Sequence, residues 1–354
     1  MSATSTQVRL ASYPVGEPQD SDFEFVTIEL PEVGDGQVLL RTVYLSLDPY
    51  MRGRMSTAKS YAAPLRIGDV VLGGTVCEVV ESRSPKRAAG DLVLAFTGWQ
   101  THAVVDARQT QRIDPSAPIS TALGVLGMPG FTAYAGLLEI GKPKAGETVV
   151  VAAAAGPVGS AVGQIAKIKG ARAVGIAGGP EKCRVLTEEL GFDVAVDHRS
   201  PTFVTDLAAA TPDGIDVYFE NVGGPVFDAV VRRLNRFARI PVCGLVADYN
   251  ATEQPTGIDQ RPGFMRRVLT LSLTVRGFIQ DEFVPTHHHD FRREMGEWVR
   301  DGSVRYREDV VEGLEQAPAA FRGLLRGQNL GKLLVQVGEL PAPAIDSAGA
   351  RARP

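Results

Sequence analysis

The feature that most constrains the fold is a glycine-containing turn between an apolar segment and an amphipathic one. Residues Thr148–Ala153 form a nearly continuous apolar run, as expected for a strand that is covered on both faces. Residues Ser160–Gly170 carry apolar side chains at helical spacing and end at a glycine, which commonly terminates a helix. The segment 153–159, with the sequence AAAGPVG, lies between them. This strand–turn–helix unit predicts a parallel sheet with helices packed on it.

The same turn has the properties of a dinucleotide-binding loop. Gly156 and Gly159 allow the backbone to approach a pyrophosphate closely, because neither has a Cβ atom. Pro157 and Val158 precede a helix whose N-terminus offers free N–H groups and the positive end of its dipole to phosphates. Alanine stands at the first of the three glycine positions of the usual motif, so the prediction depends on the strand and helix around it.

The rest of the chain supplies the other elements of an α/β protein. Five more strand candidates follow, at 171–177, 192–196, 215–220, 238–244 and 273–279. Together with the first they give six strands, the full count of a doubly wound Rossmann sheet. Before about residue 118, short alternating runs separated by glycine turns predict a β-rich barrel or sandwich.

A late strand-like run, Lys332–Val337, has the character of this early part. We therefore expect a discontinuous first domain at 1–125 and 301–340, and a Rossmann domain at 126–300. The segment 341–354 is rich in alanine and proline and is predicted to be poorly ordered.

The end of the second predicted strand bears on the choice of cofactor. An NAD site usually has a carboxylate there, to bind the ribose hydroxyls. This chain has Ala177-Gly178-Gly179-Pro180 instead, which removes the repulsion that would exclude a 2′-phosphate. Lys182 follows closely and is either the cation that binds this phosphate or a solvated helix residue. The pattern favours NADPH.

Composition excludes several other classes of protein. A formal net charge of −4 gives no reason to expect nucleic acid or an anionic membrane as a partner. The apolar stretches are too short to span a bilayer, and no secretory signal is evident, so the expected compartment is the cytoplasm. The three cysteines (Cys77, Cys183 and Cys243) include no CxxC pair, which excludes a four-cysteine structural zinc site.

Six motifs, in order along the chain, resemble a known family. The sequence is similar to the zinc-independent medium-chain dehydrogenase/reductase superfamily, and within it to the leukotriene B4 dehydrogenase/prostaglandin reductase and 2-alkenal (double-bond) reductase family. The motifs are YLSLDPYMR at 44–52, AAAGPVG at 153–159, ENVGG at 220–224, VCG at 242–244, RGFI at 276–279 and NLGK at 329–332. The resemblance implies NADPH-dependent reduction of a carbon–carbon double bond conjugated to a carbonyl. It also implies a β-rich GroES-like catalytic domain beside the Rossmann domain, a small-molecule enone or enal substrate, and a homodimer.

The resemblance also assigns individual residues. It implies that Gly156 and Gly159 contact the phosphates, that the turn at Gly178 adjoins the ribose, and that Lys182 binds the 2′-phosphate. It further implies cofactor contacts after the fourth, fifth and sixth strands and at a late asparagine. These residues are Asn221, Cys243, Gly244, Tyr249, Phe278, Ile279 and Asn329.

One position departs from the family pattern. The family often has a tyrosine near the end of the third strand that contacts the 2′-phosphate, whereas this chain has Asp197-His198-Arg199. Either His198 or Arg199 makes the contact as a cation, or Asp197 weakens it and the preference for NADPH is less strict.

The sequence predicts no catalytic metal. Zinc-dependent relatives carry a His-Glu pair before a glycine-rich turn, where this chain has GGTVC at 73–77. Cys77 is expected to be a small buried residue. The run His287-His288-His289 is expected in an exposed turn after Pro285, because three consecutive histidines cannot face one ion from a helix.

Without a metal, hydrogen-bond donors must stabilise the negative charge that hydride addition places on the carbonyl oxygen. Tyr249 and Tyr50 are the candidate catalytic residues, and the alternative for each is a loop residue without a role in catalysis. The ribose hydroxyl of the cofactor or water competes with them as the donor of the proton at the α-carbon. Arg52 and Arg54 either border the site or are solvated. Two other functions stay open: a quinone reductase of the same superfamily, and an NADPH-binding sensor or structural protein without turnover.

Overall fold

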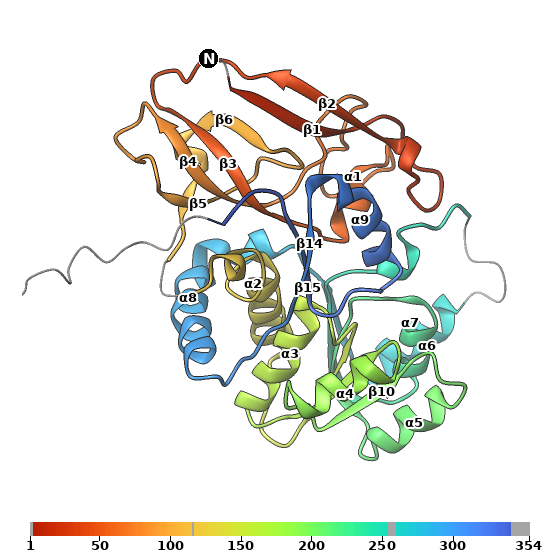
Figure 1. The fold of residues 1–354 in the computed structure, drawn as a ribbon. Helices are drawn as coiled ribbons and strands as arrows, with labels where there is room; N and C mark the ends of the chain where they lie inside the picture. Colours follow the sequence, from red (N-terminus) through yellow and green to blue (C-terminus); the bar gives the residue numbers. More distant parts are fainter. Residues whose placement is uncertain (1–2, 115–116, 254–259, 341–354) are drawn as a thin grey trace, which may run out of the picture.

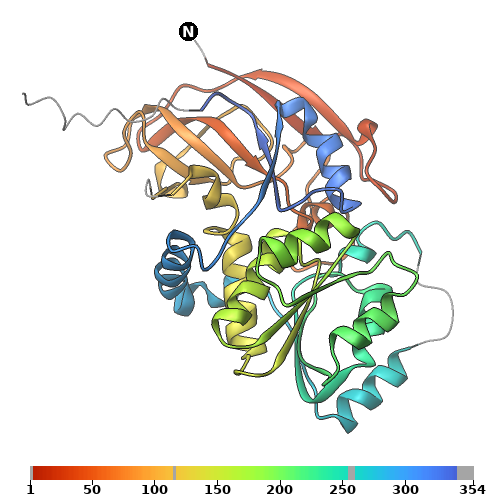
Figure 2. The same ribbon diagram turned by 60° about the horizontal axis from the view of Figure 1, so that its bottom comes forward.

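The computed structural model describes residues 3–114, 117–253 and 260–340. A β-rich part lies beside a parallel sheet flanked by helices (Figure 1), and the view in Figure 2 shows the same two-part arrangement. This confirms the predicted α/β class, with a Rossmann-type sheet and a separate β-rich sheet. The predicted tail, 341–354, lies outside the described residues.

The parallel sheet has six strands in the order β10-β9-β8-β11-β12-β13, which is the doubly wound arrangement. All six predicted strands form, with shifts at their ends. Their bounds are β8 Thr148–Ala152, β9 Arg172–Ala177, β10 Val194–Asp197, β11 Ile215–Phe219, β12 Leu234–Val242 and β13 Thr274–Gly277. The direction in which the chain adds strands reverses between β8 and β11, and ligands of such sheets bind at the carboxyl ends of the strands beside this point.

Helices cover both faces of this sheet, which explains why β8 is apolar throughout. Val149 and Val151 pack into one hydrophobic cluster, and Val150 and Ala152 pack into another on the opposite face. A strand whose successive side chains enter two different cores has no polar side. The helices are α2 Met128–Ala135, α3 Pro157–Ile168, α4 Pro180–Glu188, α5 Phe203–Ala210, α6 Gly224–Val231, α7 Arg261–Thr270 and α8 Val284–Arg300.

The β-rich part contains a sheet in the order β14-β15-β3-β4-β5-β7, with β6 paired to β3, and a separate antiparallel pair, β1 and β2. The predicted late strand forms as β15 and pairs antiparallel with β3, so the end of the chain returns to the first sheet. The strand bounds are β1 Thr4–Leu10, β2 Phe23–Glu29, β3 Gln37–Ser46, β4 Thr75–Ser82, β5 Leu92–Ala95, β6 His102–Asp106, β7 Gln111–Arg112, β14 Glu308–Glu312 and β15 Lys332–Gln336. Two helices border this part, α1 Tyr50–Arg54 and α9 Ala317–Leu325.

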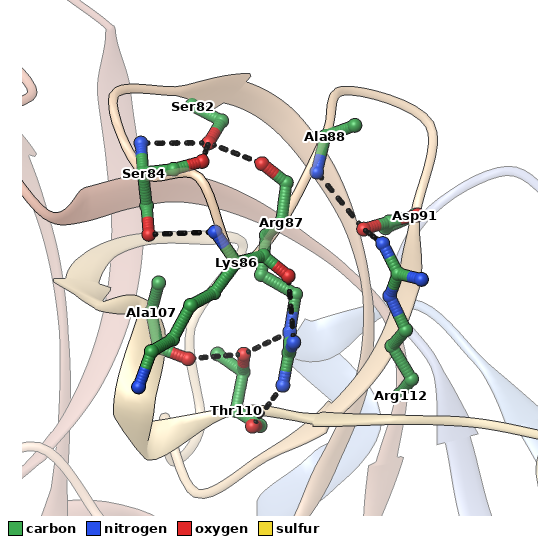
Figure 3. Close-up of polar contacts among 9 residues, drawn as sticks. All are labelled: Ser82, Ser84, Lys86, Arg87, Ala88, Asp91, Ala107, Thr110 and Arg112. Carbon is green, nitrogen blue, oxygen red and sulfur yellow. Dashed lines mark hydrogen bonds and ion pairs between the residues drawn. The ribbon is translucent and has the colours of Figure 1, made fainter.

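Polar contacts hold the turn between β4 and β5 against β7 (Figure 3). Ser82 Oγ donates to the Arg87 carbonyl at 2.7 Å, and the Arg87 guanidinium donates to Thr110 Oγ1 at 2.8 Å. Asp91 accepts from the Ala88 N–H and from Arg112, both at 2.9 Å. These contacts fix one end of the β-rich sheet without involving the other part of the molecule.

The expectation of an exposed turn at His287-His288-His289 is wrong. These residues lie within α8, because Pro285 occupies the first turn of the helix, where a missing N–H has no cost. His288 packs against Phe131 with ring centroids 5.3 Å apart, and the His287 ring lies 2.8 Å from Glu139 Oε1. His287 and His288 therefore take part in packing against α2 and the residues that follow it, whereas His289 is exposed.

Candidate functional site

The predicted phosphate loop lies at the carboxyl end of β8 and leads into α3. Ala153 has a φ of 51°, in the left-handed region where glycine is favoured, and directly precedes Ala154, which stands where the usual motif has its first glycine. A Cβ atom at Gly159 would lie 2.4 Å from the Ala153 carbonyl oxygen, so only glycine fits there. Gly156 caps α3, and Pro157 occupies its first turn. The free N–H groups at this helix end face the cleft described below, as binding of a pyrophosphate requires.

Three basic side chains, those of Lys182, His198 and Arg199, gather beside the tip of β9. A Cβ atom at Gly178 would lie 2.8 Å from Arg199 Nε and 2.9 Å from His198 Nε2, so the glycine makes room for both side chains. Lys182 Nζ donates to the Gly327 carbonyl at 2.7 Å, a contact between α4 and the returning segment of the chain. Burial and the charge of Arg199 both lower the pKa values of Lys182 and His198. An anionic group bound among these side chains, such as a 2′-phosphate, would oppose both effects and favour the protonated forms.

The Asp197 carboxylate binds backbone N–H groups beside this cluster. Its Oδ1 atom accepts hydrogen bonds from the N–H of Gly179 at 2.8 Å and from the N–H of Arg199 at 2.9 Å. The carboxylate therefore shapes the two turns that carry the cations, and its hydrogen bonds are directed to the backbone.

The residues predicted at the other end of the cofactor follow β11, β12 and β13. Asn221 Nδ2 donates to the Ala152 carbonyl at 2.8 Å, and buried Glu220 accepts from the N–H of Val222 at 2.6 Å. These bonds fix the turn after β11. Burial, together with the charge of Glu220, raises the pKa of the Cys243 thiol to about 12, so this thiol stays protonated at neutral pH.

Phe278 packs against Phe219, with ring centroids 6.1 Å apart, and Ile279 follows it at the cleft. Asn329 Nδ2 donates to the Gly331 carbonyl at 2.7 Å, and the Gly331 N–H donates to the Ala155 carbonyl at 3.0 Å. The returning segment is thereby tied directly to the phosphate loop.

One cleft of about 500 Å³ brings together every residue predicted for the site. The set is Tyr50, Gly156, Pro157, Val158, Gly159, Gly178, Lys182, His198, Asn221, Cys243, Gly244, Tyr249, Phe278, Ile279 and Asn329. The glycines leave space along its floor, the cations lie at one end and apolar side chains at the other, so the residues present fit a bound NADPH.

The two candidate tyrosines differ in their surroundings. Burial raises the pKa of Tyr249, and a hydrogen bond from the Leu245 N–H partly opposes this effect. Burial and the Asp48 carboxylate raise the pKa of Tyr50 well above its usual range. A Cβ atom at Gly244 would lie 3.3 Å from the Tyr249 hydroxyl, so the phenol folds over the end of β12. Both phenols therefore keep their protons at neutral pH and can donate a hydrogen bond.

The cleft residues that the sequence did not assign include Tyr61, Lys332 and Asp48. Tyr61 is 65 % exposed and lines the cleft from the loop after α1. Lys332, only 2 % exposed, donates to the Leu47 carbonyl at 2.6 Å and to Asp48 Oδ1 at 3.1 Å, forming a buried ion pair beside Tyr50. Asp48 and Lys332 both lie in motifs recognised from the sequence, and these motifs could have identified them as site residues. Tyr61 lies in a segment without regular structure, so no pattern identified it.

Within the described ranges, no group of three or more His, Cys, Asp or Glu side chains is arranged to hold a metal ion. Among the same residues, no helix has the length and apolar character needed to cross a membrane.

Comparison with known proteins identifies the family. A model of the N-terminal domain of oxidoreductases matches residues 6–113, and a model described as zinc-binding dehydrogenase matches residues 157–299. The NADPH-dependent curcumin reductase of Escherichia coli (strain K12) is 55% identical over 330 residues, covering 93% of this chain and 95% of that protein. The chain belongs to the zinc-independent medium-chain dehydrogenase/reductase superfamily.

Other relatives and a solved structure of the superfamily agree with this assignment. Prostaglandin reductase 1 of Oryctolagus cuniculus is 43% identical, covering 90% of this chain and 89% of that protein. The 2-alkenal reductase (NADP(+)-dependent) of Nicotiana tabacum is 41% identical, covering 94% of this chain and 98% of that protein. The crystal structure of CurA in complex with NADPH from Vibrio vulnificus matches with a TM-score of 0.91 and 51% identity, covering 96% and 100% of the two chains. The chain is an NADPH-dependent reductase of carbon–carbon double bonds.

Proposed function

We propose that this reductase acts on α,β-unsaturated aldehydes and ketones, and that Tyr249 donates a hydrogen bond to the substrate carbonyl. The observation that carries the proposal is the single cleft that joins the cation cluster of Lys182, His198 and Arg199 to the Tyr50 and Tyr249 phenols. The substrate names of the relatives support it, because prostaglandin reductase and 2-alkenal reductase are both similar over nearly their whole length.

The chain's own residues would then act as follows. Bound NADPH supplies a hydride, which adds to the β-carbon of the substrate and leaves negative charge on the carbonyl oxygen. The Tyr249 O–H donates to that oxygen and stabilises the enolate more than the ground state. The enolate must then receive a proton at the α-carbon, for which the Tyr249 and Tyr50 phenols, water and the ribose hydroxyl of the cofactor are the candidate donors.

The substrate class is tested by steady-state assays with NADPH against an alkenal, a cyclic enone and a quinone. We expect oxidation of NADPH with the first two substrates and much slower turnover of the quinone. Quinone turnover that exceeds enone turnover would favour the quinone-reductase alternative. Tight NADPH binding without oxidation by any of the three would favour the sensor alternative.

We further infer that two copies of the chain associate through the β13 edge of the parallel sheet. β13 is the last strand in that sheet among the described residues, and all of its side chains are exposed. Apolar side chains gather beside it on α7 and on the strand itself: Met265, Leu269 and Val275. An unpaired edge next to exposed apolar side chains is typical of a site that pairs with another strand, and a second copy offers the same edge.

The homodimer predicts a specific response to substitution. Val275→Lys adds a charge at the proposed interface, so we expect light scattering to show a shift from the mass of two chains to that of one. Val204→Lys, at an exposed valine on α5, is the matched control and should leave the mass unchanged. A wild-type protein with the mass of one chain at micromolar concentration would contradict the proposal.

We also infer that the protein works in the cytoplasm. Cys77, Cys183 and Cys243 are all free thiols, which is usual in a reducing compartment. Cell fractionation followed by immunodetection tests this location.

A further inference from the structure

A buried arginine connects the two segments that carry the candidate catalytic tyrosines. Arg52 lies on α1, two residues after Tyr50, and is only 6% exposed. Its Nε atom donates to Asn250 Oδ1 at 3.0 Å, and Asn250 directly follows Tyr249 in the chain. From the sequence, Arg52 was expected either to border the site or to be solvated. In the structure Arg52 is buried and does not line the cleft.

The rest of the guanidinium is bound by backbone carbonyls from a third segment. Arg52 Nη2 donates to the Gly16 carbonyl at 2.8 Å and to the Pro14 carbonyl at 3.1 Å. The same segment approaches the Tyr249 loop, because a Cβ atom at Gly16 would lie 3.5 Å from Thr252 Cγ2. Three chain segments that are distant in sequence therefore meet around one side chain.

The chemistry of this contact indicates positioning and not simple packing. The guanidinium donates three hydrogen bonds, to Asn250 Oδ1 and to the Pro14 and Gly16 carbonyls, and all three acceptors are neutral oxygens. Burial of a charged group is unfavourable and lowers the pKa of Arg52, while the charge of Asp22 opposes this effect. An apolar side chain would fill the space at lower cost, but it would not fix the direction of the Asn250 side chain.

We propose that Arg52 is a positioning residue that holds the Tyr249 loop in register with the Tyr50 helix, so that the Tyr249 phenol meets the substrate carbonyl. This inference rests on the proposed role of Tyr249 as the hydrogen-bond donor. Loss of the contact should leave the cofactor end of the cleft intact, because Lys182, His198 and the phosphate loop are on other segments. The effect should therefore fall on kcat for the enone and not on binding of NADPH.

The test uses Asn250→Ala, which removes the acceptor, and Asn250→Asp, which keeps an oxygen at the same place. We expect Asn250→Ala to lower kcat about tenfold, since small displacements of a catalytic group have effects of this order or larger. Asn250→Asp should restore most of the activity, and the Kd for NADPH, measured by fluorescence, should stay unchanged in both. Arg66→Met, at an exposed arginine of the neighbouring loop, is the control and should have no effect.

A double-variant experiment separates positioning from general stability. In a Tyr249→Phe background, Asn250→Ala should lower kcat little further, because the group that it positions is already absent. If Arg52→Met folds, it is compared in the same way with and without Tyr249→Phe. If it does not fold, the Asn250 variants alone test the positioning role. Equal losses for Asn250→Ala and Asn250→Asp, or a full further loss in the Tyr249→Phe background, would overturn the proposal.

The two possible failures give different results. If Tyr249→Phe leaves kcat unchanged, the role of Tyr249 is wrong and the positioning role falls with it. If Tyr249→Phe lowers kcat and Asn250→Ala does not, Tyr249 keeps its role and only the role of Arg52 is overturned.

Discussion

Replacing Tyr249 by phenylalanine is expected to lower kcat for an enone about 100-fold, the size of effect seen when one donor to a developing oxyanion is removed. The phenol folds over the end of β12 beside Gly244, at the end of the cleft opposite the cations. Its O–H is therefore placed to donate, and phenylalanine keeps the ring while removing the hydroxyl, together with the hydrogen bond that this hydroxyl accepts from the Leu245 N–H. Steady-state rates with saturating NADPH and enone measure the effect.

Tyr50→Phe is the matched comparison for this experiment. Burial and the neighbouring Asp48 carboxylate raise the pKa of Tyr50. We expect a loss of less than about tenfold in kcat, since Tyr249 is the proposed main donor to the oxyanion. If Tyr50→Phe has the larger effect, Tyr50 and not Tyr249 is the main donor. NADPH binding should be unchanged in both variants.

Replacing Lys182 by alanine is expected to raise the KM for NADPH about 10- to 100-fold, because a hydrogen bond between two charged groups contributes roughly 1.5–3 kcal/mol. The KM for NADH should stay nearly unchanged, since NADH has no 2′-phosphate for the ammonium group to bind. The comparison of the two cofactors is essential, because Lys182 also donates to the Gly327 carbonyl. A general effect of losing that contact would change both KM values.

Lys86→Ala, at an exposed lysine in the turn between β4 and β5, is the control for the loss of one positive charge and should leave both KM values unchanged. Equal increases for NADPH and NADH in Lys182→Ala would show that Lys182 acts through the Gly327 contact and not through the phosphate.

The sequence predicted the parallel sheet well, because its strands are buried on both faces and appear as continuous apolar runs. It did not predict β1, since Ser5 and Gln7 are buried on this strand and interrupt the apolar alternation. Ser5 Oγ donates to the His102 carbonyl at 2.7 Å, and Gln7 Nε2 donates to Gln100 Oε1 at 2.7 Å. Hydrogen bonds between distant segments satisfy these groups, and such partners are not visible in local patterns.

Partners that are distant in sequence also limited what could be predicted at the site. The glycines of the phosphate loop and Lys182 were found because their spacing is local and their chemistry is specific. The buried pair of Lys332 and Asp48 joins two motifs from opposite ends of the chain, so neither motif alone indicated it. The role of Arg52 could not be predicted because its partner, Asn250, is distant in sequence and belongs to no recognisable motif.

The pairing of β15 with β3 has a consequence for folding during synthesis. Leu334 pairs with Ser46, so the first sheet is completed by almost the last described residues of the chain. The strands of the parallel sheet, in contrast, come from one continuous stretch, Thr148–Gly277. The nucleotide-binding part can therefore fold on the ribosome while β3, which pairs with β4 and β6, still lacks β15 beside residues 44–46. Conditions that slow the completion of translation would prolong the exposure of β3 and favour aggregation.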